Sequence, residues 1–187
     1  MNKIIYMGMA ARLVSDKHHN LIIDLILKKK NFFINNNIKF LFAGDGVLFK
    51  PLKERVKKNN VNDIIYFSGY LNEQELIKWF KKLNIYIHLS KGETTSTSIL
   101  QAMSMSLPII ASDVSGNRNL NKSKNRMRNI ILVKNDIKNI YNSLKILVKN
   151  KSLQKKLGTF SRKIVIKNYS CEIMFRKYLK LINNWKK

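Results

Sequence analysis

The sequence predicts a doubly wound α/β domain, in which helices cover both faces of a parallel sheet. Short apolar runs alternate with longer amphipathic segments along the chain. The apolar runs lack the alternation of polar and apolar residues that a half-exposed strand shows, so both faces of each strand should be buried. The chain has 187 residues, 45% of them apolar, and is therefore long enough to build one sizeable core.

Six apolar runs are predicted as strands. The run "IKFLFAG" is apolar almost throughout and ends in Gly44, a residue that commonly closes a strand. The polar and basic segment 115–129 precedes the last strand and is predicted as a mobile surface loop. The expected strands are 3–9, 38–44, 63–69, 84–90, 107–113 and 128–133.

The segments between these strands carry helix signals. "HNLIIDLILKKKNFF" is amphipathic at helical spacing. Pro51 falls in the first turn of its helix, where a missing N–H has no cost, and Asn72 is a good N-cap for the next. The expected helices are 19–33, 49–59, 72–83, 97–106 and three more between about 136 and 185.

The charge balance is extreme. The chain contains 36 Lys and Arg against 11 Asp and Glu, a formal net charge of +25. Such a field attracts nucleic acid, acidic lipid headgroups or phosphorylated small molecules, although a solvated basic surface explains it equally well. The single Cys171 excludes an internal disulfide, and we expect it to be a half-buried packing residue. No secretory signal and no apolar run of about 18 residues is present, so we expect a cytoplasmic protein.

In an open parallel sheet, ligands bind beyond the carboxyl ends of the strands. Arg12 and Lys17 follow the first predicted strand in "ARLVSDK". A guanidinium fork and an ammonium group at a strand end suit a diphosphate. The alternative is that they are two more basic residues of a very basic surface. No His or Cys spacing typical of a metal site occurs, and adjacent His18 and His19 would point in different directions.

The stretch "HLSKGETTSTSILQAM" combines one acid with a run of hydroxyl residues. Thr94, Thr95 and Ser96 lead into the helix 97–106, whose free N–H groups and positive dipole end suit phosphate. Glu93 would repel phosphate, so we expect it to point away and to accept hydrogen bonds from neutral hydroxyls. Gln101 lies on the side of the helix that could reach back to the loop. A carboxylate and an amide both bind sugar hydroxyls well, although an N-cap box with a polar loop remains the alternative.

Read in order, these segments resemble the C-terminal half of a group 1 glycosyltransferase, of glycosyltransferase family 4 with the GT-B fold. "AARLVSDKHHNLIIDLI" is similar to the family's G-R-L-x-x-x-K-G opening, and "IKFLFAGDG" to its strand followed by Gly-x-Gly. "GETTSTSILQAMSMSLPIIASDVSGN" resembles its E-x7-E-A-M-x-x-G-x-P-V-I-A-S-d-x-G-G signature. The resemblance covers nearly the whole chain, residues 1–187, and implies one Rossmann-like domain that binds a nucleotide sugar.

The resemblance also implies roles for individual residues. Arg12 and Lys17 would hold the diphosphate and Glu93 the donor sugar's hydroxyls, as the groups closest to catalysis. The remaining donor-binding positions would be Gly44, the backbone around Tyr70 and Leu71 beside the base, the N–H groups of Thr94, Thr95 and Ser96, and Gln101 at the ribose. Enzymes of this type are metal-independent and retaining, so neither a metal nor another cofactor is expected.

Four positions depart from the family pattern. Ala11 and His18 replace glycines of the opening motif, Gln101 replaces a Glu, and Ser106 replaces a Gly at the helix end. Gln keeps the capacity for hydrogen bonding but loses a charge, and Ser106 should affect packing only. The N-terminal GT-B half, which carries the acceptor pocket, is absent from the sequence.

The leading hypothesis is a donor-binding glycosyltransferase domain that acts in surface polysaccharide or glycolipid synthesis. It would use a UDP or GDP sugar and need an N-terminal-type GT-B domain on another chain. A non-catalytic remnant is one alternative. Another is a basic protein that binds nucleic acid or acidic membranes; nucleic acid is disfavoured because no RNA- or DNA-binding motif accompanies the lysines. Peripheral contact with the inner face of an anionic membrane is compatible with the leading hypothesis.

Overall fold

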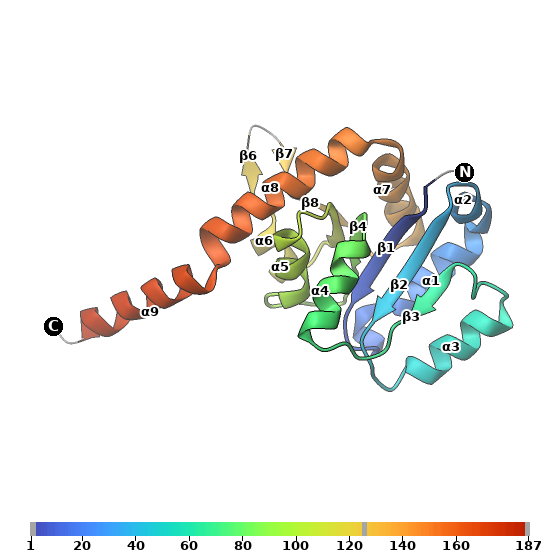
Figure 1. The fold of residues 1–187 in the computed structure, drawn as a ribbon, viewed down its shortest axis with the longest axis horizontal. Helices are drawn as coiled ribbons and strands as arrows, with labels where there is room; N and C mark the ends of the chain where they lie inside the picture. The colour runs from blue at the N-terminus through green and yellow to red at the C-terminus, as the bar shows by residue number, and fades with distance from the viewer. Residues whose placement is uncertain (1–2, 125–126, 186–187) are drawn as a thin grey trace.

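A computed structural model describes residues 3–124 and 127–185 of the chain. Within them, six strands form one parallel sheet in the order β3-β2-β1-β4-β5-β8 (Figure 1). The order reverses direction between β1 and β4, which makes this pair the switch point of a doubly wound fold. The strands are β1 (Ile5–Ala10), β2 (Ile38–Ala43), β3 (Ile65–Phe67), β4 (Ile85–His88), β5 (Ile109–Ser112) and β8 (Ile130–Val133).

Alternate strand residues bury into two separate cores, one on each face of the sheet. In β1, Met7 and Met9 belong to one core and Ala10 to the other. In β4, Ile85 and Ile87 point to the first core and Tyr86 to the second. This period of two is what a strand covered on both faces requires. The predicted doubly wound α/β class is therefore confirmed.

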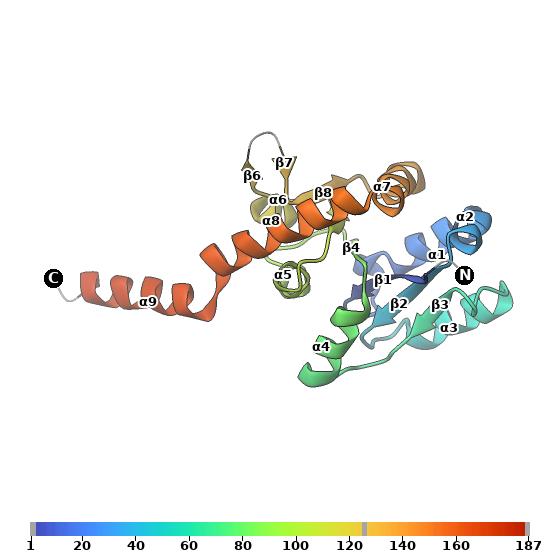
Figure 2. The same ribbon diagram turned by 45° about the horizontal axis from the view of Figure 1, so that its top comes forward.

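Two sets of helices cover these faces, as the two views show (Figures 1 and 2). The first core is closed by α1 (His19–Lys28), α2 (Lys30–Asn35), α3 (Phe49–Lys58) and α7 (Ile137–Lys149). The second is closed by α4 (Glu73–Lys82), α5 (Thr97–Ser104), α6 (Ser115–Leu120) and α8 (Lys151–Tyr169). Gly8 lets the second set approach closely, because a Cβ there would lie 2.7 Å from the Trp79 ring.

Helix α9 (Cys171–Trp185) follows α8 and extends away from the body of the domain (Figures 1 and 2). None of its residues is buried, and Cys171 is exposed rather than half-buried as expected. No helix in the described part of the chain is both long enough and apolar enough to cross a bilayer.

Two of the predicted elements are wrong in detail. The helix expected over 19–33 is two helices, because the backbone at Lys29 leaves helical geometry (φ −125°, ψ 28°). The loop expected over 115–129 contains α6 and a two-stranded ribbon of β6 (Ser123–Lys124) and β7 (Met127–Arg128). Residues 125 and 126 lie outside the described part of the chain.

Candidate active site

The loops after β1 and β4 meet at the switch point of the sheet. Lys17 ends a short 3₁₀ turn, η1 (Ser15–Lys17), and its Nζ donates a hydrogen bond to Oε1 of Glu93. The two side chains are 18% and 11% exposed, so this ion pair is largely shielded from water. The predicted cation and the predicted acid thus lie together at the expected edge, although 76 positions separate them in sequence.

His88, the last residue of β4, is a third member of this group. Its Nε2 lies 2.7 Å from the same Oε1 of Glu93, and its ring is only 2% exposed. Ser98 Oγ and Tyr86 Oη lie 3.4 Å from Nδ1 on the other side of the ring. A carboxylate only accepts hydrogen bonds, so Nε2 carries the hydrogen that bonds Glu93, while Nδ1 faces the two hydroxyls.

Sequence reasoning missed His88. The available signal was a polar residue closing an otherwise apolar run, "IYIH", at the carboxyl end of a predicted strand.

Tyr86, whose ring stacks near that of His88, is fully buried, and burial raises the pKa of its hydroxyl, which therefore stays protonated. That hydroxyl accepts from the N–H of Ala10 at 3.3 Å and so links β4 to β1 behind the site.

Glu93 is ionised in this environment. Burial alone would raise its pKa, but hydrogen bonds from His88 and Lys17, together with their charges, outweigh burial and lower the pKa to about 2. The partners of Glu93 within the protein are an ammonium group and an imidazole rather than hydroxyls, and the expected contact with sugar hydroxyls stays a prediction. Both donors reach Oε1, and among the described residues none bonds Oε2.

The hydroxyl run forms a wall of the site beside His88, since Ser96 Oγ and Ser98 Oγ each lie 3.4 Å from a nitrogen of its ring. Ser96 is the N-cap of α5 and is buried, and its Oγ accepts from the N–H of Ile99 at 3.4 Å. Thr94 and Thr95 are exposed at the start of the helix. Lys17, His88, Glu93 and the residues of this wall line a cavity of about 200 Å³; the full lining is Ala10, Ala11, Lys17, His88, Glu93, Thr95, Ser96, Thr97 and Ser98.

Gly116, in the first turn of α6, holds the loop in place. Its N–H donates to the carbonyl of Glu93 at 3.1 Å, and a Cβ at this position would lie 2.3 Å from that oxygen. Only glycine allows so close an approach of the two backbones. Gly116 thus fixes the backbone from which the Glu93 side chain projects.

Other predicted site residues lie outside the cavity. Arg12 is exposed on the loop after β1, beside Ala11 of the lining. Tyr70 is 78% exposed, while Leu71 packs partly against the second core. Gln101 is exposed on α5 and its side chain contacts no other described residue through a hydrogen bond.

Gly44 packs one loop against another. Its φ of +126° favours glycine, and a Cβ there would lie 2.1 Å from the carbonyl oxygen of Ala11. Its N–H donates to the carbonyl of Gly69 at 2.7 Å. Gly44 therefore positions the loop after β1 and does not itself line the cavity.

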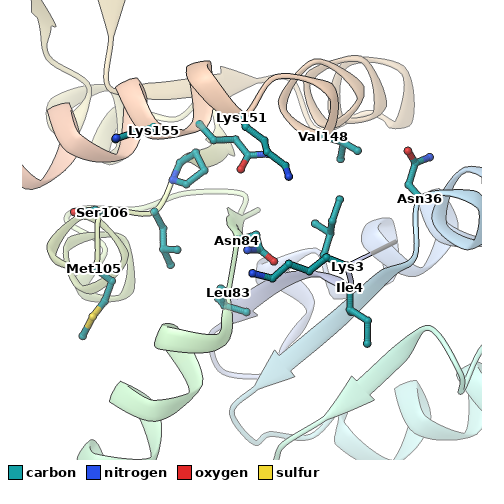
Figure 3. A pocket seen from close by; sticks show the side chains of 14 residues that line it. Lys3, Ile4, Asn36, Leu83, Asn84, Met105, Ser106, Val148, Lys151 and Lys155 are labelled. Atoms are coloured by element: carbon teal, nitrogen blue, oxygen red, sulfur yellow. The ribbon is translucent and has the colours of Figure 1, made fainter. Parts of the chain in front are cut away.

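A larger hollow of about 630 Å³ lies at the opposite edge, at the amino ends of the strands (Figure 3). Lys3, Asn84 and Lys151 are among its lining residues. It contains no carboxylate among the described residues, and the strand-end motifs do not reach it. Its size alone therefore does not make it the donor site.

The model of the family "Glycosyl transferases group 1" matches residues 2–164. A poly(ribitol-phosphate) alpha-N-acetylglucosaminyltransferase of Staphylococcus aureus is 24% identical over 95% of this chain and 35% of its own length. Protein CapJ of S. aureus is 32% identical over 62% of this chain and 29% of its own length. The chain spans about a third of the length of these curated relatives.

Solved structures agree on the fold. HepE of Anabaena, in complex with UDP and glucose, superposes with a TM-score of 0.83 at 14% identity, over 96% of this chain and 48% of that one. The C-terminal domain of a group 1 glycosyl transferase, LpcC of Francisella tularensis, gives a TM-score of 0.76 at 19% identity, over 89% of this chain and 87% of that one. The fold is half of a GT-B fold, and with the family model matched over most of its length, the chain belongs to the group 1 glycosyl transferase family.

Proposed function

We propose that this chain is the donor-binding domain of a retaining, metal-independent glycosyltransferase. It binds a nucleotide diphosphate sugar at the carboxyl edge of the sheet. The observation that carries the proposal is a cavity lined by the bonded group of Lys17, His88 and Glu93 together with the start of α5. Cations and free helix N–H groups suit phosphate, and an ionised carboxylate suits sugar hydroxyls.

The contacts suggest a separate role for each of these three residues. Oε2 of Glu93 is free to accept a hydroxyl of the sugar. When a diphosphate enters, Lys17 can turn from Glu93 to the phosphate, and His88 still holds Oε1 at 2.7 Å. The positive charge beside the diphosphate then stabilises the leaving group as the glycosidic bond to it breaks. With Lys17 and His88 both bonded to it, Glu93 is ionised with a pKa of about 2, so it meets the sugar as a hydrogen-bond acceptor rather than as a general acid.

The cavity of about 200 Å³ is smaller than the roughly 300–1,000 Å³ of typical ligand pockets. It therefore accommodates the sugar and the nearest phosphate, and the rest of the nucleotide lies over the outer loops. Arg12, exposed beside Ala11, is our proposed contact of the distal phosphate, and Tyr70, Leu71 and Gln101 remain proposed contacts of the nucleoside. The UDP and UDP-glucose bound in HepE make uridine nucleotides the first ligands to test.

We further propose that transfer needs an N-terminal-type GT-B domain, on this or another chain, to carry the acceptor, and that the product is a surface polysaccharide or glycolipid. The relatives give limited support, because one acts on poly(ribitol phosphate) and the match covers only 35% of its length. A non-catalytic remnant that retains donor binding is the competing proposal. Transfer assays with and without a candidate partner domain distinguish the two.

The test is calorimetric titration with UDP, GDP and their sugars. We expect Lys17→Ala to weaken UDP binding by at least about tenfold, since it removes a charge-assisted contact to phosphate. Lys91→Ala is the matched control, because Lys91 is exposed, pairs with Asp16 and, although it is on the same loop as Glu93, does not line the cavity. Equal affinities of the two variants, or no binding at millimolar ligand, would remove the proposal.

A further inference from the structure

Backbone hydrogen bonds hold the loop that carries Glu93 from two sides. The N–H of residue 91 donates to the carbonyl of Asp16, in η1, at 2.8 Å. This contact does not depend on the side chain at 91. The N–H of Gly116 donates to the carbonyl of Glu93 itself at 3.1 Å. The loop is therefore tied to the turn that carries Lys17 and to the start of α6.

A ring of hydrogen bonds adds a third attachment, and this one uses side chains. Ser112, the last residue of β5, is fully buried, and its Oγ accepts from the N–H of Ser90 at 2.8 Å. The same hydroxyl donates to Oδ1 of Asn135 at 2.5 Å, and Nδ2 of Asn135 donates to the carbonyl of Ser90 at 3.0 Å. The ring thus joins the carboxyl ends of β4, β5 and β8 and satisfies both backbone groups of Ser90.

Hydrogen bonds rather than packing determine the path of the loop beyond Ser90. Leu89 is the last buried apolar residue before Glu93. Gly92 is exposed, and no described atom outside the adjoining residues lies within 4 Å of where its Cβ would stand. Yet Oε1 of Glu93 lies 2.7 Å from Nε2 of His88, which is on a strand five positions earlier. A displacement of Ser90 would therefore move Glu93 relative to His88.

We propose that Asn135 is a positioning residue of the donor site. Acting through Ser112 and Ser90, it holds the loop so that the carboxylate of Glu93 stays against His88 and faces the sugar. Asn135 is exposed and does not belong to the described lining of the cavity, so it acts without touching the ligand. Its effect on sugar binding rests on the proposed donor site, whereas its effect on Glu93 itself does not.

The experiment compares the wild type with Asn135→Ala, by calorimetric titration with UDP and UDP-glucose and by carbon-13 NMR titration of the Glu93 carboxyl. The dissociation constant for UDP-glucose, divided by that for UDP, should rise by about threefold or more, the effect of losing roughly one hydrogen bond. The constant for UDP should change by less than about twofold, because its phosphates meet Lys17 and the start of α5. The pKa of Glu93 should rise, because hydrogen bonds from His88 and Lys17 keep it low against the effect of burial.

Two further variants separate positioning from stability. Ser112→Ala removes the hydroxyl shared by the ring and should reproduce both effects. Asn150→Ala is the matched control, because Asn150 is also exposed and its Oδ1 accepts a backbone hydrogen bond, from the N–H of Leu153 at 2.8 Å, at the N-cap of α8. This variant should lower the stability of the fold and leave the affinity ratio and the pKa of Glu93 at their wild-type values.

The proposal is overturned if the pKa of Glu93 in Asn135→Ala is the same as in the wild type or in Asn150→Ala. Equal losses of affinity for UDP and UDP-glucose overturn it too, since they indicate a general disturbance of the site. If the wild type binds neither nucleotide, the proposed donor site fails. A pKa of Glu93 that rises in Asn135→Ala and not in Asn150→Ala would then still show that the ring positions the carboxylate.

Discussion

At the scale of single residues, the central feature is one carboxylate oxygen shared by two donors. Lys17 Nζ and His88 Nε2 both reach Oε1 of Glu93, which keeps the acid ionised and leaves its other oxygen for a ligand. His88 is in turn flanked by the hydroxyls of Ser98 and Tyr86. The position of Glu93 thus depends on strand β4 as well as on its own loop.

This arrangement predicts a stability change at acid pH. The pKa of Glu93 is about 2 in the folded protein against a reference of 4.5, so the folded state stabilises the ionised form of Glu93. Its contribution is fully present above about pH 4.5 and is lost as the pH falls towards 2, on the order of 2 kcal/mol in all. Glu93→Gln should flatten the free energy of unfolding over this window, as measured by urea denaturation.

Glu54→Gln on the exposed side of α3 is the control and should leave the pH profile of the wild type intact. If the Glu93→Gln profile retains the full slope between pH 4.5 and 2, the ion pair and the imidazole contact do not hold the acid ionised in solution.

At the scale of elements, helix α5 ends in a motif that normally requires glycine. Leu107 N–H donates to Ala102 and Ser106 N–H to Met103, each at 3.1 Å, the pattern of a Schellman C-cap. Ser106 occupies its left-handed position with φ +57°. The sequence comparison predicted that this Ser affects packing only; the structure shows that it bears backbone strain. His18, which also replaces a glycine of the family pattern, is left-handed as well, with φ +46°.

Ser106→Gly should therefore stabilise the domain by about 0.5–1 kcal/mol, because relief of the left-handed strain exceeds the entropy that glycine adds to the unfolded chain. Ser104→Gly, two residues earlier within the helix, should lower the stability by a similar amount. Chemical denaturation midpoints measure both. A loss of stability in both variants would contradict the left-handed C-cap.

The elements that sequence analysis found are those with apolar periodicity. All six strands and the capped helices α4 and α5 carry such a pattern. The N-cap predicted at Asn72 is confirmed, and Glu75 completes a capping box with it. The pattern could not locate the break at Lys29, because apolar residues recur on both sides of it. The predicted fold was enough to place Lys17 and Glu93 at the same edge of the sheet. The contact of His88 with Glu93 could be found only in the structure.

The prediction of a loop over 115–129 is wrong because asparagine is common in loops, and this segment contains several. In the structure, several of these asparagines are buried, and their side chains form hydrogen bonds with backbone groups. Asn117 Nδ2 donates to Ser112 O at 2.9 Å, Asn121 Oδ1 accepts from Ile130 N at 3.2 Å, and Asn129 Oδ1 accepts from Lys122 N at 2.6 Å. Such contacts depend on tertiary structure, so local composition does not reveal them.

At the scale of the whole molecule, opposite edges of the sheet carry different chemistry. The carboxyl edge has the shielded Lys17–Glu93 pair and the start of α5, whereas the amino edge and α8 carry exposed lysines. The net charge of +25 therefore falls on surfaces of different kinds. Part of it surrounds the proposed donor site, and part lies along α8 and the amino edge.

The most direct measurement of donor binding at the carboxyl edge is amide chemical-shift mapping of the isotope-labelled chain during titration with UDP. We predict that the amides of Ala11, Lys17 and residues 93–98 shift together and saturate, while those of α8 stay unchanged. Saturable shifts confined to the amino-edge hollow around Asn84 and Lys151, with the carboxyl edge silent, would contradict the donor site proposed here.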